Sequence, residues 1–255
     1  MFSIIFVAIV LVVAPAQSKK CNLKIEEKGS LPFVESIEIK DTKYGKAVIT
    51  EVPSHRNGEL KAVKHIVYDK MGLEIDLLKE FGPKKVSVCL VHHRTMDEPS
   101  EKDIESALNL GGCGNKLPRR GSRSDYYYLP RHCNGVLNEE QMKIAKEECD
   151  DVTMVCGADV EENVETHSKR ALELAIDHMQ DESKRAVLRE FTACDPQSTM
   201  ALMSCQPSRL VADCHFTTKF CTYGLKCPLN VHGGYWNCNY NHKFAQVKCC
   251  DYKCR

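Results

Sequence analysis

The sequence lacks the short signatures of several enzyme classes, and it has no excess of charge of either sign. It contains neither the Gly-x-Ser-x-Gly elbow of α/β-hydrolases nor a His-Glu-x-x-His helix that would hold zinc beside a general base. The glycine-rich stretch 110–116 lacks the Gly-Lys-Ser/Thr ending that grips phosphate. The 35 basic and 35 acidic side chains cancel, so attraction of the whole molecule to nucleic acid or to an anionic membrane is not supported. We expect no catalytic residues, no cofactor and no metal.

The chain also has no apolar stretch of the roughly 20 residues that a membrane-spanning helix requires. The apolar run Ile4–Val13 is only ten residues long and is followed by the small residues Ala14, Ala16 and Ser18. This pattern predicts a secretory signal peptide over residues 1–18, cleaved after Ala16 or Ser18. No Asn-x-Ser/Thr sequon is present, so N-glycosylation is not expected. We therefore predict a secreted, extracellular protein with no membrane span.

What the sequence has in abundance is cysteine, and closely spaced cysteines in a secreted chain usually form disulfides. Six lie in residues 19–193 and nine in residues 194–255. We interpret 19–193 as an α+β domain with its own core and 194–255 as a region in which disulfides replace a large core. Because fifteen is odd, at least one thiol is free or bridges to another chain, and the counts place it in the second region. The disulfide candidates are Cys21, Cys89, Cys113, Cys133, Cys149, Cys156, Cys194, Cys205, Cys214, Cys221, Cys227, Cys238, Cys249, Cys250 and Cys254.

Residue patterns in the first region predict both strands and helices. The β-prone segments are 33–40, 46–52, 60–68 and 85–91. Gly45 lies in the first turn, and the pair Asn57-Gly58 is the strongest short signal for a hairpin.

Apolar residues at helical spacing predict a helix over 71–81 that ends at Gly82-Pro83. Asn138 with Gln141 predicts the capped start of another helix, and further helical segments begin at Ser100, Ser168 and Ser183. The predicted fold class is therefore α+β, with a mixed N-terminal region of β-hairpins and helices followed by a disulfide-rich, helix-poor C-terminal region.

The last residues, 247–255, have a superficial likeness to the Cys-Cys-x-x-His-Asp-x-Cys motif of secreted phospholipases. Lys253 stands at the histidine position, and an ammonium group cannot act as the general base. The spacing Cys250-x₃-Cys254 would suit half of a zinc site, but no second compact pair follows. We interpret this tail as a C-terminal disulfide anchor with a basic surface.

The candidate binding surface is a basic, tyrosine-rich stretch between Cys113 and Cys133. If these two cysteines pair, the stretch is a constrained and displayed loop, and arginine and tyrosine are common interface anchors. The alternative is a solvated loop that runs into a tyrosine-rich strand. The candidate binding residues are Arg119, Arg120, Arg123, Tyr126, Tyr127 and Tyr128.

Two other functions stay open at this point. A hydrolase with a dispersed active site would use His92, His93 or His132 with nearby carboxylates. His92 and His93 would point to opposite faces of a strand, so they cannot easily chelate one ion, and we interpret them as an exposed loop pair. An extracellular carrier or structural protein would instead have a binding cavity between the helices and the sheet.

The layout of the chain resembles a known family. A short signal peptide, an early Cys21 leading into LPFVESIEIKDTKYGKAVI (residues 31–49), a cysteine-poor middle and a cysteine-crowded end are similar to scoloptoxin family 11, the large cysteine-rich venom proteins of centipedes. The resemblance implies a secreted, non-enzymatic venom toxin. Its partner would be a protein, such as an ion channel or a receptor whose activity it modulates.

Overall fold

The computed structural model describes residues 19–26, 31–82, 85–94, 105, 120–131, 133, 135–159, 164–180, 204–226, 229–230, 235–236 and 239–255. The predicted signal peptide and the helix predicted from Ser183 lie outside these residues, and of the helix predicted from Ser100 only Glu105 lies within them. Among the described helices, none combines the length and hydropathy that a membrane crossing requires.

The fold is mostly β and is built on one ten-stranded sheet, with strand order β1-β2-β3-β4-β5-β6-β8-β7-β12-β9. The first six strands form an antiparallel meander: β1 Lys19–Ile25, β2 Phe33–Thr42, β3 Gly45–Val52, β4 Val63–Tyr68, β5 Leu73–Phe81 and β6 Val86–His93. The other strands are β7 Arg120–Arg131, β8 Thr153–Asp159, β9 Leu210–Lys226 and β12 Asn239–Cys254. The β6–β8 and β7–β12 pairs are parallel. A separate small pair joins β10 Leu229–Asn230 to β11 Tyr235–Trp236.

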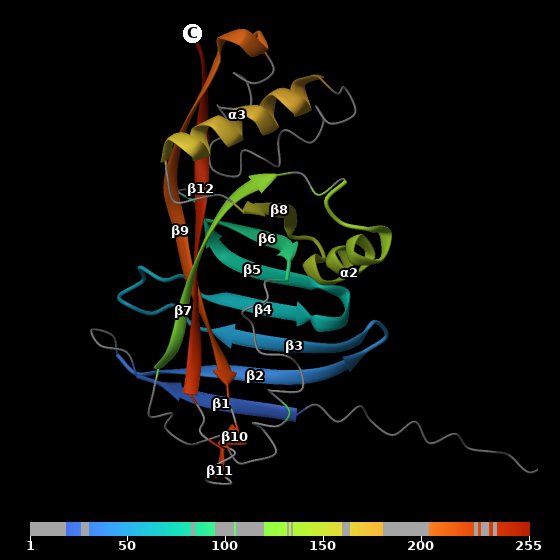
Figure 1. The fold of residues 1–255 in the computed structure, drawn as a ribbon, viewed down its shortest axis with the longest axis vertical. Coiled ribbons are helices and arrows are strands. Elements are labelled where there is room, and N and C mark those ends of the chain that lie inside the picture. The colour runs from blue at the N-terminus through green and yellow to red at the C-terminus, as the bar shows by residue number, and fades with distance from the viewer. Residues whose placement is uncertain are drawn as a thin grey trace, which may run out of the picture.

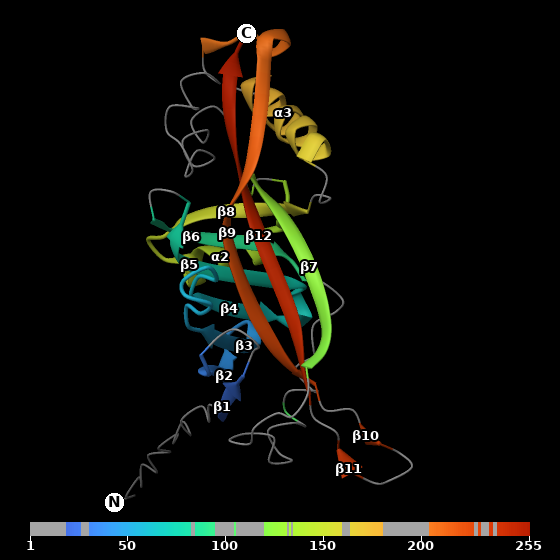
Figure 2. The same ribbon diagram turned by 90° about the vertical axis from the view of Figure 1, so that its left-hand side faces the viewer.

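The sheet folds over on itself, so that its two ends form two layers. The long strands β7, β9 and β12 run across the stack of strands β1–β6 (Figures 1 and 2). The layers touch directly, because Lys61 N donates to Lys219 O at 2.8 Å beside the bridge between Lys61 and Phe220. One large core lies between them and contains Leu23, Ile37 and Val63 from the meander and Phe220, Tyr223 and Val247 from β9 and β12.

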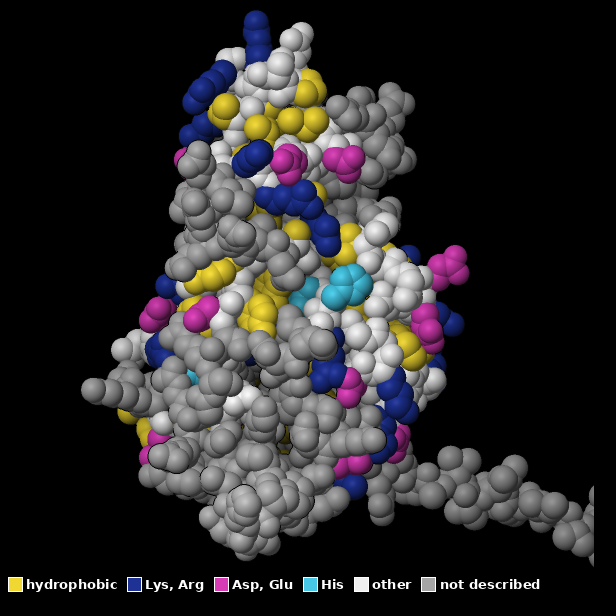
Figure 3. Space-filling view, viewed as in Figure 1, with side chains coloured by type: hydrophobic (Ala, Val, Ile, Leu, Met, Phe, Trp, Pro, Cys, Tyr) yellow, Lys and Arg dark blue, Asp and Glu magenta, His cyan; other side chains and the backbone are white. Residues whose placement is uncertain are grey.

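Two helices and two single turns complete the described structure. The helix α2 Glu139–Cys149 covers the outer face of the meander, where Ile144 and Ala145 pack with Ile66 and Ile75. The helix α3 Val164–Gln180 packs Ala171 and Ala175 against the upper parts of β9 and β12 (Figure 1). The 3-10 turns η1 Asp69–Met71 and η2 Pro207–Arg209 precede β5 and β9. Basic and acidic side chains are interspersed over the described part of the face in Figure 3, in keeping with the zero net charge.

Four disulfides join described cysteines, and each stays within one of the two cysteine groups. They are Cys89–Cys149, Cys133–Cys156, Cys205–Cys254 and Cys214–Cys250. The pairing of Cys133 with Cys156 corrects the idea of a loop closed by Cys113 and Cys133. Cys21 and Cys249 are also disulfide-bonded. The buried thiol of Cys221 donates to the carbonyl oxygen of Thr222 at 3.7 Å, and it lies in the region where we placed the odd cysteine.

Most predicted strands are confirmed, and one predicted helix is wrong. The segments expected to be strands are β2, β3, β4 and β6, and the turns have positive φ at Gly45 and at Asn57-Gly58. The segment 71–81 is instead a strand, β5, between β4 and β6. Its alternation of apolar and acidic residues is a period of two, and both faces of the strand are buried.

The tail also differs from expectation in one respect. Its described residues contain little helix, as predicted, but the region does not replace a core with disulfides, since Phe220, Tyr223 and Val247 are buried in the main core. The sheet thus runs through both 19–193 and 194–255, the regions that differ in cysteine density.

The start of α2 provides a test of a local prediction. Asn138 Oδ1 accepts from Gln141 N at 2.8 Å, and Gln141 Oε1 accepts from Asn138 N at 3.1 Å. We expect Asn138→Ala to lower the free energy of unfolding by about 1 kcal/mol, because it removes the side-chain acceptor of the Gln141 N–H. Urea denaturation of the oxidised protein measures this. Asn138→Asp keeps an acceptor and should cost much less, so equal losses for the two variants would contradict the capping role.

Candidate functional site

Five charged or titratable side chains, here called the interior cluster, lie between the two layers of the sheet. Side chains alternate across a strand, so His65 of β4, Glu74 and Asp76 of β5 and His92 of β6 share the inner face of the meander with core residues such as Val63 and Leu78. The register sets His65 opposite Asp76 and Glu74 opposite His92. Lys243 of β12 completes the cluster from the other layer.

The cluster is a continuous chain of contacts. Asp76 Oδ1 lies 2.6 Å from His65 Nδ1, and Asp76 Oδ2 lies 2.8 Å from His92 Nε2. The other ring nitrogen of His92, Nδ1, is 3.3 Å from Glu74 Oε2. Glu74 also accepts a hydrogen bond from Lys243, so the chain of contacts crosses from one layer to the other.

Tyrosines of β7 border this cluster. The Lys243 ammonium lies 5.2 Å from the centre of the Tyr126 ring, within the range of a cation–π contact. The rings of His92 and Tyr128 are 4.6 Å apart. The strands β7 and β12 are thereby held against the meander.

The cluster is closed to solvent, and its charges compensate one another. The five side chains are between 0% and 8% exposed. Burial raises the pKa of Asp76, but the charge of His65 and the hydrogen bonds from His65 and His92 outweigh it and hold that pKa below its usual range. Asp76 is therefore ionised at neutral pH and serves as the acceptor for both imidazoles.

This geometry is suited to holding the layers together more than to catalysis. A catalytic imidazole needs a ring nitrogen that reaches substrate, whereas both nitrogens of His92 are engaged by Asp76 and Glu74. The interpretation of His92 and His93 as an exposed loop pair was wrong, because both lie in β6 and His92 is buried. They do point to opposite faces, as expected, and His93 Nε2 lies 3.1 Å from Val136 O. His132 lies outside the described residues.

Another inner-face carboxyl, Glu35 of β2, lies in a different environment. Its side chain is fully buried, and neither carboxyl oxygen makes a hydrogen bond of normal geometry. Burial raises the pKa of Glu35 well above its ordinary value, opposed by the charge of His65 and the backbone N–H of Tyr223. Nearby, the His55 ring stacks on Phe33 with 4.3 Å between ring centres, and His55 Nε2 lies 2.9 Å from the Tyr223 hydroxyl.

The structure places the predicted binding tyrosines in a strand. Tyr126, Tyr127 and Tyr128 belong to β7, between β8 and β12, which corresponds to the alternative of a tyrosine-rich strand. Tyr128 is fully buried, so its ring cannot contact a partner directly, while Tyr126 and Tyr127 are half-buried. Arg119 lies outside the described residues, as do the side chains of Arg120 and Arg123. Binding by these arginines stays a prediction.

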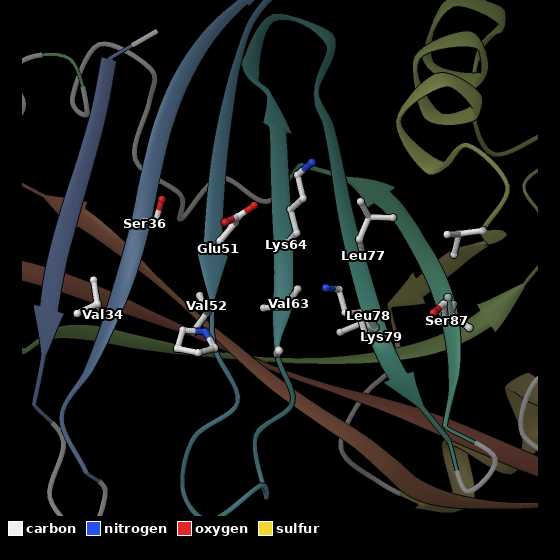
Figure 4. Close-up of a pocket in the computed structure, with 14 residues that line it drawn as sticks. Val34, Ser36, Glu51, Val52, Val63, Lys64, Leu77, Leu78, Lys79 and Ser87 are labelled. Atoms are coloured by element: carbon white, nitrogen blue, oxygen red, sulfur yellow. The ribbon is translucent and has the colours of Figure 1, made fainter.

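The outer face of the meander, opposite the interior cluster, contains a depression that the sequence did not predict. It is called the outer groove here. It has a volume of about 550 Å³, within the range of ligand sites. In Figure 4, Ser36, Glu51, Lys64 and Leu77 stand on one face of four neighbouring strands, and the register sets each opposite the next. The lining residues are Val34, Ser36, Glu51, Val52, Pro53, Ala62, Val63, Lys64, Leu77, Leu78, Lys79, Ser87, Val88 and Val152.

The outer groove combines an apolar floor with charged side chains at its rim. Small residues, Ser36, Ala62 and Ser87, leave the hollow between longer ones. Within the described part of the chain, Lys64 and Lys79 have no ion-pair partner, whereas Lys61 pairs with Glu80 at 3.1 Å. The alternation of residues along each strand predicts which side chains share the outer face. It does not predict that α2 leaves the region of the groove uncovered.

Neither site holds an evident metal position, since the described residues contain no group of three or more His, Cys, Asp or Glu side chains arranged to bind an ion. Comparisons of the chain with protein-family models, with curated proteins and with solved structures find no match. The function proposed below is therefore argued from the geometry of the chain itself.

The ion pair across the layers predicts a non-additive response to mutation. Lys243→Met should lower the free energy of unfolding by about 3 kcal/mol, because it leaves the Glu74 carboxylate buried without its cation. Adding Glu74→Leu should recover most of this loss, since an apolar pair of similar size needs no desolvation of charge. Chemical denaturation of the two single variants and the double variant measures the coupling. Additive losses would contradict the proposed pairing.

Glu35 predicts a pH dependence of opposite sign to that of Asp76. Because its pKa is raised in the folded state, its contribution is most favourable below its unfolded pKa and is lost as pH rises through the folded value. Glu35→Gln should therefore be more stable than the native protein at pH 8, by on the order of 1 kcal/mol for each unit of raised pKa. Its stability should also decline less between pH 5 and pH 8. Melting curves across this range test it, with Glu38→Gln on the outer face of β2 as the control.

Proposed function

We propose that the chain is a secreted, disulfide-stabilised toxin of the venom type that its sequence resembles, and that it modulates an ion channel or receptor by binding. The observation that carries the proposal is the outer groove. Exposed apolar surface beside charged groups without partners is typical of interaction sites, and Val34 in the groove is 54% exposed.

The frame beneath the groove supports a binding role. The strands β2–β6 that form its floor are paired on both sides, and the disulfide Cys89–Cys149 ties β6 to the end of α2. On the other face of the same strands, the interior cluster fixes β4, β5 and β6 against β12. A rigid site loses little conformational entropy when a partner binds, and affinity benefits. Multiple disulfides are also typical of extracellular proteins.

The alternatives receive less support. For an enzyme, the histidines and carboxylates that sequence reasoning named would have to face a substrate, whereas His92 is closed off between Asp76 and Glu74. For a carrier, a cavity that encloses most of the ligand is expected. The outer groove instead has exposed rim residues such as Glu51 and Lys79, which suits a partner that brings its own covering surface.

Whole-cell recordings on a broad panel of channels and ligand-gated receptors test this function. We expect the oxidised protein at micromolar concentration to change at least one current, and Leu77→Glu to weaken that effect about tenfold or more by placing an unpaired charge in the groove. Lys61→Gln, outside the groove, should act like the native protein. No change across the panel, or an unchanged effect of Leu77→Glu, would contradict the proposal.

A further inference from the structure

The outer groove carries a more specific inference about what occupies it. Among the described residues, the exposed large hydrophobic side chains are Leu31, Val34 and Val86. Val34 lines the groove, Leu31 precedes it by three residues, and Val86 is next to the lining residue Ser87. Of these three, Val34 is the one that lines the groove, since Val86 alternates with Ser87 on β6 and Leu31 precedes β2, so the exposed apolar side chain of the groove lies on its β2 side.

The charged side chains of the groove indicate the sign of charge that a partner would carry. Lys64 and Lys79 stand on neighbouring strands, and neither has an ion-pair partner in the described part of the chain. Some other lysines of the meander are paired, as Lys46 is with Glu105 at 2.7 Å and Lys61 with Glu80 at 3.1 Å, whereas Lys20 and Lys40 also have no ion-pair partner in the described part of the chain. Glu51, opposite Lys64, is the one carboxylate among the lining residues. Two lysines against one glutamate leave the rim positive, which is complementary to an anionic partner.

We propose that the outer groove binds an acidic–apolar peptide segment of a protein partner. An apolar side chain of the segment lies on the floor beside Val34 and Leu77, and carboxylates on either side of it pair with Lys64 and Lys79. The inference rests on the proposed function, since it names the chemistry by which the target is recognised.

A peptide segment fits the groove better than a free anionic amphiphile does. A small ligand is held by walls that bury most of its surface. Here the strands β2–β6 and their turns supply the whole lining apart from Val152, and no second layer closes over it among the residues described. A segment that belongs to a folded partner covers the open side with its own protein, so the contact buries area on both surfaces.

The size of the effect follows from the kind of contact. Exposed ion pairs contribute little individually and are screened by salt. Losing both lysines should therefore weaken binding by about fivefold to tenfold, and the difference should shrink at high salt. A charge placed on the apolar floor should weaken it more, since an unpaired charge there cannot be desolvated cheaply.

The experiment uses the full oxidised chain and a fluorescein-labelled synthetic peptide, Glu-Asp-Leu-Phe-Val-Asp-Glu, followed by fluorescence anisotropy. Matched peptides replace the acids by lysine or the three apolar residues by serine. The variants are Lys64→Gln with Lys79→Gln, and Val34→Asp, with Lys61→Gln as the matched control. Far-UV circular dichroism and melting temperature establish that each variant is folded.

Supporting results are binding of the acidic–apolar peptide alone, a loss of about fivefold to tenfold in the double lysine variant, a larger loss in Val34→Asp and no change in Lys61→Gln. Equal binding of the lysine-substituted peptide, or full binding by the double variant, would overturn the inference. Dodecanoate that binds the groove while no peptide does would overturn it in favour of a free amphiphile.

This outcome can be separated from that of the proposed function. Peptide binding that depends on Lys64 and Lys79, together with a silent channel panel, would leave the groove chemistry standing and remove the channel or receptor as target. A current that responds to the protein but not to loss of these lysines would keep the function and remove the inference.

Discussion

The buried ion pair between Lys243 and Glu74 links the two layers of the sheet and constrains how they pack. It joins β12, near the end of the chain, to β5 in the meander, across a core from which water is excluded. Burying two charges costs several kcal/mol for each ion unless each finds a partner. Here the cost is offset within one chain of contacts, in which Glu74 also meets His92, and His92 and His65 share Asp76. A slip of β12 against β5 would separate buried charges, so the ion pair favours the observed register of the layers.

The two faces of the meander have different roles in this arrangement. The inner face carries the buried charges and the main core, and the outer face is left to α2 and to the groove. Rigidity on the inner side benefits the outer side, since the same strands supply both. The disulfides act further out. Cys89–Cys149 holds α2, Cys214–Cys250 joins β9 to β12, and Cys205–Cys254 joins the segment before η2 to the end of β12, where α3 packs. Buried ion pairs thus act in the middle of the sheet, and disulfides act at α2 and at the far parts of β9 and β12.

Local signals predicted local features well and failed where a distant partner changed the meaning of a residue. The turn at Asn57-Gly58 and the cap at Asn138 depend on residues within a few positions, and both form as expected. The segment 71–81 was expected to be a helix because its apolar residues lie at helical spacing before Gly82-Pro83. In the structure Glu74 and Asp76 are buried, and their partners, Lys243, His65 and His92, come from other strands. For the tyrosines 126–128 the sequence left both a displayed loop and a tyrosine-rich strand open, and they lie in a strand whose neighbour β12 is more than 100 residues away in the chain.

The sequence by itself determined the chemistry that is available: an α+β composition with many β-prone segments, cysteines that fall into a sparse and a dense group, zero net charge and the absence of familiar catalytic signatures. These properties depend on residue type and on short spacing. Only the tertiary structure decided which cysteine meets which, that Glu74 and Asp76 lie inside, and that Lys64, Lys79 and Val34 share an uncovered face. The reason is physical, because burial, ion pairing and exposure are properties of where strands distant in the chain come to lie, and in this sheet that is set by contacts between its first half and its last.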